Sequence, residues 1–110
     1  MREKILLINP PSSREDCICV LPPLGVLSLA AFMRRAGFGV AVADFNIDRR
    51  WRENLHTIMR RERPDVVGIS SNFSNKALAL EIALMIKRFA GNITVVVGGP
   101  HPTIAPEEYT

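Results

Sequence analysis

Four short apolar runs, rich in β-branched residues, alternate with three amphipathic segments, and this alternation constrains the fold more than any other feature. The apolar runs are Lys4–Asn9, Val40–Phe45, Asp65–Ser70 and Thr94–Gly98. Such short runs, apolar on both faces, are typical of strands buried in a parallel sheet. The segments between them repeat apolar residues at helical spacing and cover Leu24–Ala36, Arg50–Glu62 and Asn75–Ala90. We therefore predict a chain of βα units.

Breaker residues and apolar stripes define the predicted helices. Gly37 closes the first helix, Pro64 stops the second, and Gly91 is the predicted C-cap of the third. The first helix carries two apolar lines. One consists of Leu24, Leu27 and Ala31, and the other of Val26, Ala30 and Met33. The predicted stripe of the third is Leu78, Ile82, Met85 and Phe89. In the second, Trp51 is the predicted core anchor. Residues Pro102–Tyr109 are predicted to form the first turns of a fourth helix.

Right-handed crossovers between these units give a doubly wound α/β fold with three layers and a parallel sheet. This is a flavodoxin-like Rossmann architecture with the expected strand order 2-1-3-4, and a fifth strand is not identified. The 110 residues suit one domain. We expect residues 1–110 to be a single domain at the N-terminus of a larger protein, because the sequence stops just as a helix begins.

Charge and composition narrow the classes of partner. The formal charge is +3, and eight of the 14 basic residues fall between Arg34 and Arg63. Six of these flank the amphipathic segment Arg50–Glu62, where only Trp51 offers a ring for stacking on a base, so we interpret the region as a solvated or domain-docked face and expect no nucleic-acid partner. No apolar run approaches the roughly 20 residues of a membrane span. Without an export signal, the cytoplasm is the expected location, with Cys17 and Cys19 as reduced thiols.

The candidate site lies at the carboxyl ends of the strands, where ligands bind in open α/β sheets at the point where strand order reverses. The residues there are mostly small or able to form hydrogen bonds, so a ligand can approach the backbone closely. The predicted cofactor-binding residues are Asn9, Pro10 and Pro11 after the first strand, Ser70, Ser71 and Asn72 after the third, and Gly98, Gly99, Pro100 and His101 after the fourth. No metal-ligand set is identified among them.

Several cofactor classes are disfavoured by these loops. A dinucleotide site needs a G-x-G-x-x-G turn after the first strand, whereas this chain has NPPSSRED. A Walker loop is absent, and Ser70 and Ser71 stand where a phospho-receiver domain has aspartate. Pro10 and Pro11 remove backbone donors that a flavodoxin phosphate loop requires.

Four sequence pieces together carry a family resemblance: ILLINPP (Ile5–Pro11), PPLGVLSLAAFMRRAG (Pro22–Gly37), DVVGIS (Asp65–Ser70) and VVVGGPHPTIAPEE (Val95–Glu108). With these pieces in this order, the chain resembles the N-terminal cobalamin-binding domain of cobalamin-dependent radical S-adenosylmethionine enzymes. Within that family, its sequence is most similar to those of anaerobic magnesium-protoporphyrin IX monomethyl ester oxidative cyclases.

The resemblance implies cobalamin as the cofactor, with its nucleotide tail between the first and third strands and its corrin on the loop tips. It assigns tail contacts to Ser70 and to Gly98-Gly99, so that Gly99→Val is expected to close the tail route. No histidine lies between Asn9 and Pro22, so no cobalt ligand is expected from this domain.

The resemblance also implies that the parent protein is an oxidative cyclase or a methyltransferase. S-adenosylmethionine and a 4Fe-4S cluster would bind in its downstream radical domain. This segment alone is expected to catalyse nothing. Two alternatives stay open: a family member that has lost the cofactor and acts as an interaction domain, and a stand-alone nucleotide- or flavin-binding domain.

Overall fold

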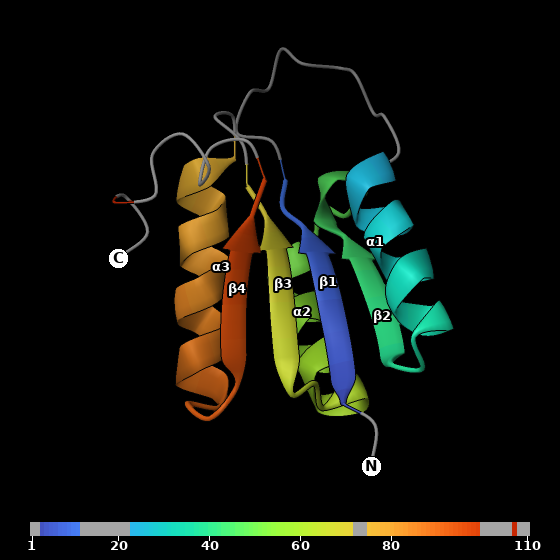
Figure 1. Ribbon diagram of the computed structural model, residues 1–110. Helices are drawn as coiled ribbons and strands as arrows, with labels where there is room; N and C mark the ends of the chain where they lie inside the picture. Colours follow the sequence, from blue (N-terminus) through green and yellow to red (C-terminus); the bar gives the residue numbers. More distant parts are fainter. Residues whose placement is uncertain (1–2, 12–22, 72–74, 100–106, 108–110) are drawn as a thin grey trace.

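A computed structural model describes residues 3–11, 23–71, 75–99 and 107 of the protein. Four parallel strands form one sheet in the order β2-β1-β3-β4, as the sequence predicts (Figure 1). The strands are β1 (Lys4–Asn9), β2 (Gly39–Asp44), β3 (Val66–Ser70) and β4 (Thr94–Gly98). The helices are α1 (Leu24–Arg35), α2 (Trp51–Glu62) and α3 (Lys76–Phe89), with a short 3-10 turn η1 (Phe45–Ile47) after β2. Among the described residues, the four predicted strands and the first three predicted helices are present, with ends shifted by one residue at most.

The strand register brings all four carboxyl ends to the same edge of the sheet. Leu7 of β1 lies opposite Val42 on one side and Gly68 on the other, and Ser70 lies opposite Gly98. The switch in strand order therefore falls between β1 and β3. A parallel sheet of this kind places its ligand crevice beyond these carboxyl ends.

The main hydrophobic core lies between the sheet and the two helices α2 and α3. Side chains alternate along a strand, so Leu6, Ile8, Val67 and Ile69 all point to this face. Ile82 of α3 is fully buried against them. Further members of the core are Trp51, Leu55 and Met59 of α2 and Ala79 and Ile86 of α3. The prediction that Trp51 anchors α2 is therefore confirmed.

The opposite face of the sheet is covered only in part. Helix α1 packs there with a second, smaller cluster around Ile5, Leu7 and Ala30 (Figure 1). Val96 of β4, on this same face, is 53% exposed. The predicted burial of the strands on both faces therefore holds for β1 but is wrong for β4.

Two predicted helix stripes need correction. In α1 only the line of Val26, Ala30 and Met33 packs against the sheet. The other predicted line faces away from the sheet, and its first residue, Leu24, is 70% exposed. In α3 the predicted residues Leu78, Ile82 and Met85 do pack in the core, but its most buried line is Ala79, Ile82 and Ile86, and Phe89 is 40% exposed. Both helices are apolar around more than one face, so periodicity alone did not identify the inner one.

The predicted glycine cap of α3 is wrong. The helix ends at Ala90 in extended backbone, and the only described glycines with positive φ are Gly37 and Gly99. Ala90 N–H still donates to the Ile86 carbonyl, and the Lys87 ammonium donates to the Ile93 carbonyl beyond the turn. These bonds close the helix without a left-handed residue. The predicted fourth helix at 102–109 lies outside the described residues except for Glu107.

The described helices include none with the length and apolar character needed to cross a membrane.

Candidate cofactor groove

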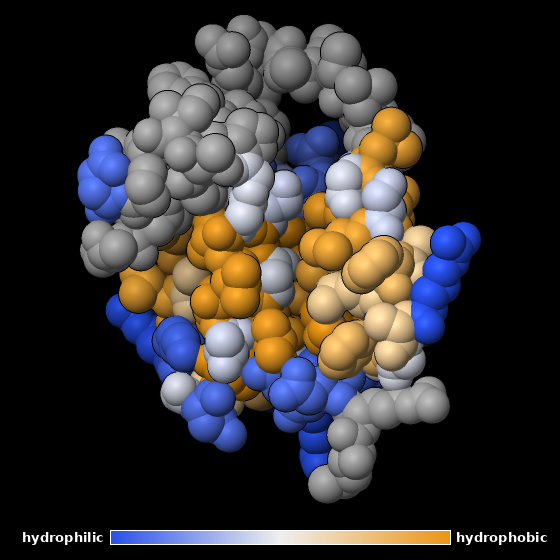
Figure 2. Space-filling model, viewed as in Figure 1, coloured by the Kyte–Doolittle hydropathy of each residue, from blue (hydrophilic) through white to orange (hydrophobic). Residues whose placement is uncertain are grey.

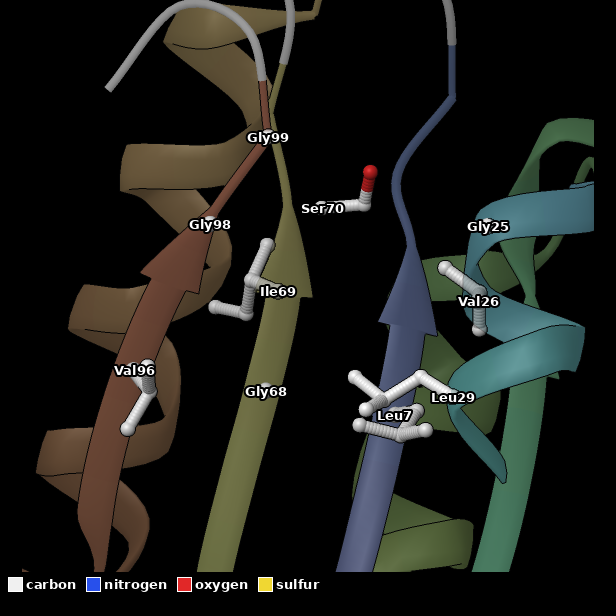
Figure 3. Close-up of a pocket in the computed structure, with 10 residues that line it drawn as sticks. All are labelled: Leu7, Gly25, Val26, Leu29, Gly68, Ile69, Ser70, Val96, Gly98 and Gly99. Carbon is white, nitrogen blue, oxygen red and sulfur yellow. The ribbon is translucent and has the colours of Figure 1, made fainter. Parts of the chain in front are cut away.

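A groove of about 370 Å³ opens between α1 and the half-covered face of the sheet. Figure 2 shows this face as an apolar band, with polar side chains gathered below it. Small-molecule pockets in proteins span roughly 300–1,000 Å³, so this volume is sufficient for part of a cofactor. Ten residues line the groove: Leu7, Gly25, Val26, Leu29, Gly68, Ile69, Ser70, Val96, Gly98 and Gly99 (Figure 3).

The floor of the groove comes from three neighbouring strands. Leu7, Gly68 and Val96 lie at opposite positions of β1, β3 and β4. Two positions of this floor, Gly68 and Gly98, carry no side chain, but only Gly98 leaves open space. A Cβ atom at position 68 would lie 2.8 Å from Cδ2 of Leu7, so the leucine side chain lies over this glycine. At position 98 a Cβ atom would meet nothing within 4 Å.

One wall of the groove is the first half of α1. Gly25 lies in the first turn of this helix, and Val26 and Leu29 follow toward the lower end of the groove (Figure 3). The helix begins at the same edge of the sheet where the strands end. Its first backbone N–H groups therefore lie at the mouth of the groove, where a helix favours negative charge.

The mouth of the groove combines one hydroxyl with bare backbone. The Ser70 side chain stands at the upper end, between β3 and β1 (Figure 3). Gly99 has φ of +118°, a conformation that L side chains rarely adopt. Next to it, Ser71 N–H donates to the Gly98 carbonyl at 2.7 Å. This bond continues the β3–β4 pairing past the strand ends and brings the two loops close together.

The structure brings together only some of the predicted site residues. Ser70, Gly98 and Gly99 line the groove. Ser71 is fully buried and does not line it, because alternation along the chain turns it away from Ser70. Asn72, Pro100 and His101 lie outside the described residues, as do Cys17 and Cys19.

The residues after β1 lie beside the groove rather than in it. The Asn9 amide donates to Oδ1 of Asp44 at 2.9 Å, and Asn46 N–H donates to the same oxygen at 3.2 Å. Asn9 therefore joins the ends of β1 and β2. Pro10 is buried and Pro11 is half-buried.

Seven lining residues were not identified from the sequence: Leu7, Gly25, Val26, Leu29, Gly68, Ile69 and Val96. One of them carried a usable signal. Glycine in the interior of an apolar strand often marks a place where a ligand approaches closely, and Gly68 is such a residue. The apolar members carried none, because in sequence they are indistinguishable from core residues.

The groove has a simple chemical character. None of its lining residues is ionisable, and Ser70 supplies the only polar side chain among them. It therefore suits a flat, largely apolar group that needs few hydrogen bonds. The fold and this site define a doubly wound α/β module that holds a cofactor at the switch point of its sheet.

A family model narrows this class further. The model of the B12 binding domain matches residues 19–110, which is most of the chain, and the protein belongs to this family.

Two curated relatives extend well beyond this domain. An uncharacterised methyltransferase of Pyrococcus horikoshii is 34% identical over 109 residues, covering 94% of this chain and 23% of the relative. The cytidylyl-2-hydroxyethylphosphonate methyltransferase of Streptomyces wedmorensis is 27% identical over 125 residues, covering 96% of this chain and 23% of the relative. The chain thus spans less than a quarter of the length of these proteins.

Solved structures share the fold. The radical S-adenosylmethionine methyltransferase TsrM from Kitasatospora setae, with cobalamin and a [4Fe-4S] cluster bound, aligns with a TM-score of 0.79 at 24% identity, over 96% of this chain and 21% of TsrM. The cobalamin-dependent radical enzyme OxsB, with aqua-cobalamin and S-adenosylmethionine bound, aligns with a TM-score of 0.74 at 22% identity, over 98% of this chain and 15% of OxsB.

The groove fits the nucleotide tail of cobalamin. The tail ends in a flat dimethylbenzimidazole and carries a ribose and a phosphate. The open floor at Gly98 leaves room for a flat ring against the sheet, with the Ser70 hydroxyl and the first turn of α1 at the mouth for the polar part.

Proposed function

We propose that this chain binds cobalamin with the nucleotide tail inserted between α1 and the β1, β3 and β4 strands. The observation that carries the proposal is the groove beside α1, whose floor is open at Gly98 on a face of the sheet that α1 covers only in part. A folded domain of this size has few reasons to leave such a gap in its own packing, because interiors are normally close-packed.

The bound form should be base-off. A tail buried in the groove cannot also place its benzimidazole on cobalt. The sequence between Asn9 and Pro22 has no histidine to replace the base. His56 lies on α2, near Phe89, on the other side of the sheet. We therefore propose that this domain gives cobalt no imidazole ligand, which suits the methyl-transfer or one-electron chemistry that the cofactor supplies when bound.

The parent protein is proposed to be a cobalamin-dependent radical S-adenosylmethionine enzyme. In this proposal residues 1–110 are its N-terminal cobalamin domain, and S-adenosylmethionine and a 4Fe-4S cluster bind in the following domain. Both curated relatives are named as methyltransferases. Their names support methyl transfer as the reaction of the parent protein, over the oxidative cyclisation that the sequence resemblance suggested. A cytoplasmic location stays a prediction from the sequence.

The competing function is an interaction domain that has lost its cofactor. The groove argues against it, since loss of the cofactor would remove the need for glycine at position 98, where a side chain would meet nothing within 4 Å. A flavin- or dinucleotide-binding role is disfavoured because the groove mouth lacks a phosphate-binding glycine loop after β1.

The test is a titration of the protein with hydroxocobalamin and with reduced Co(II) cobalamin, followed by visible absorption and electron paramagnetic resonance. We expect saturable binding on the order of micromolar or weaker, because a single domain of 110 residues leaves the upper face of the corrin open to water. The spectra should be base-off, without nitrogen hyperfine coupling from a protein ligand. A base-on spectrum or histidine nitrogen coupling would overturn the binding mode, and no saturable binding would overturn the function.

A further inference from the structure

We propose, on the basis of the tail-binding function above, that this groove selects among cobamides by their lower base. It should favour a benzimidazole base over a purine base such as adenine. The determinants are the apolar side chains at its lower end, Leu7, Leu29 and Val96.

None of the described side chains that line the lower end of the groove offers a hydrogen-bonding group to a base. Leu7 and Leu29 lie there, and Val96 flanks them across the sheet (Figure 3). Gly68 is paired with β1 on one side and β4 on the other. Its peptide groups therefore point along the sheet, within the ladders, and not up into the groove. Ser70, the one hydroxyl, stands at the mouth instead.

The two classes of base differ where they would meet this surface. Dimethylbenzimidazole presents two methyl groups on its outer edge, which gain from apolar contact. Adenine presents ring nitrogens and an exocyclic amine, which lose hydrogen bonds to water on entering an apolar site. The groove is open along one side, so part of that hydration survives. We therefore expect a discrimination of about tenfold, near the lower limit for an unpaired polar group.

The experiment compares three ligands by spectral and calorimetric titration: cobalamin, adeninylcobamide, and cobinamide, which has no nucleotide tail. We expect cobalamin to bind about tenfold more tightly than adeninylcobamide, and cobinamide to bind more weakly than cobalamin. Equal affinity for cobalamin and adeninylcobamide, with both above cobinamide, would overturn the selectivity and leave tail binding intact. Equal affinity for all three would overturn the tail-binding function itself.

A matched pair of variants on α1 tests the assignment to the groove. Leu29 lines the groove and is 47% exposed, whereas Leu27 is 44% exposed and does not line it. Leu29→Gln should reduce the ratio between the two affinities to about threefold or less, because the amide can partner the purine edge. Leu27→Gln should leave the ratio unchanged.

An isosteric variant on the floor gives a second measurement. Val96→Thr adds one hydroxyl to the edge strand without changing side-chain volume, and it should reduce the ratio in the same direction. An unchanged ratio in both Leu29→Gln and Val96→Thr, with each variant folded, would contradict the proposed determinants.

Discussion

A Cβ atom at Gly99 would lie 2.4 Å from the carbonyl oxygen of Ser71, closer than real side chains approach backbone. Gly99 is therefore required by the contact between the loops after β3 and β4. This changes the meaning of the Gly99→Val variant suggested by the sequence. Its side chain would meet Ser71 and strain the backbone, so a loss of cobalamin binding could not be assigned to a blocked groove.

Gly98→Val is the sharper test of the groove. Position 98 is extended, lies on the same face as Val96, and has open space where a side chain would stand. We expect valine there to fill the tail route and to weaken cobalamin binding by at least about tenfold, with little change in stability. The measurement is the same spectral titration. Thr94→Val is the matched control, because it adds an apolar branched residue on the same strand outside the groove. Undiminished binding by folded Gly98→Val would contradict the proposed tail site.

The two adjacent glycines should differ in their effect on stability. Gly99→Ala must adopt φ near +118° and displace Ser71, so we expect a loss of about 2 kcal/mol or more in the free energy of unfolding. Gly98→Ala has no such conflict, and alanine restricts the unfolded chain, so its effect should lie within about 1 kcal/mol of zero. Urea denaturation followed by circular dichroism measures both. Equal effects would show that the Gly99–Ser71 contact is not maintained in solution.

The core prediction uses two residues of α3. Ile82 is fully buried, whereas Leu84 is 60% exposed. Ile82→Ala should lower the free energy of unfolding by about 2–5 kcal/mol through lost burial and a residual cavity. Leu84→Ala should change it by less than about 1 kcal/mol, because little burial is lost. Thermal or urea denaturation gives the comparison, and a larger effect at Leu84 would contradict the assigned helix face.

The stability should depend on pH through Glu62. Its carboxylate lies 2.8 Å from the Lys4 ammonium. The hydrogen bond from Lys4, with a smaller contribution from Arg61, holds the pKa of Glu62 below its usual value of 4.5, against the opposing effect of desolvation. A carboxyl group whose pKa is lowered on folding stabilises the protein above its unfolded pKa. That stabilisation is lost as the pH falls from about 4.5 through the folded pKa.

We therefore expect Glu62→Gln to be less stable than the wild type at pH 7 and to lose less stability on acidification below about pH 4.5. Urea denaturation across this pH range provides the measurement. Glu53→Gln is the control, because the Arg50–Glu53 pair is largely exposed and should contribute little. Parallel pH profiles of Glu62→Gln and the wild type would show that the Lys4 pair does not act on stability.

The sequence alone was sufficient for the order and type of the elements. Strand runs such as Lys4–Asn9, helical stripes and breaker residues are local patterns, set by side-chain period and backbone preference within a few residues. The strand order also followed, because right-handed crossovers between short βα units leave few topologies. Ser70, Gly98 and Gly99 were predicted because they follow strand ends.

Only the tertiary structure decided which face of each helix is buried and where the groove lies. Leu27 and Leu29 are the same residue type two positions apart, yet only Leu29 lines the groove, because the rotation of α1 on the sheet separates them. Gly68 became a site residue only when Leu7 and Val96 were placed on either side of it. The groove is the space left between elements that are distant in the sequence. Local sequence patterns do not determine the spacing between such elements, so they could not predict the groove.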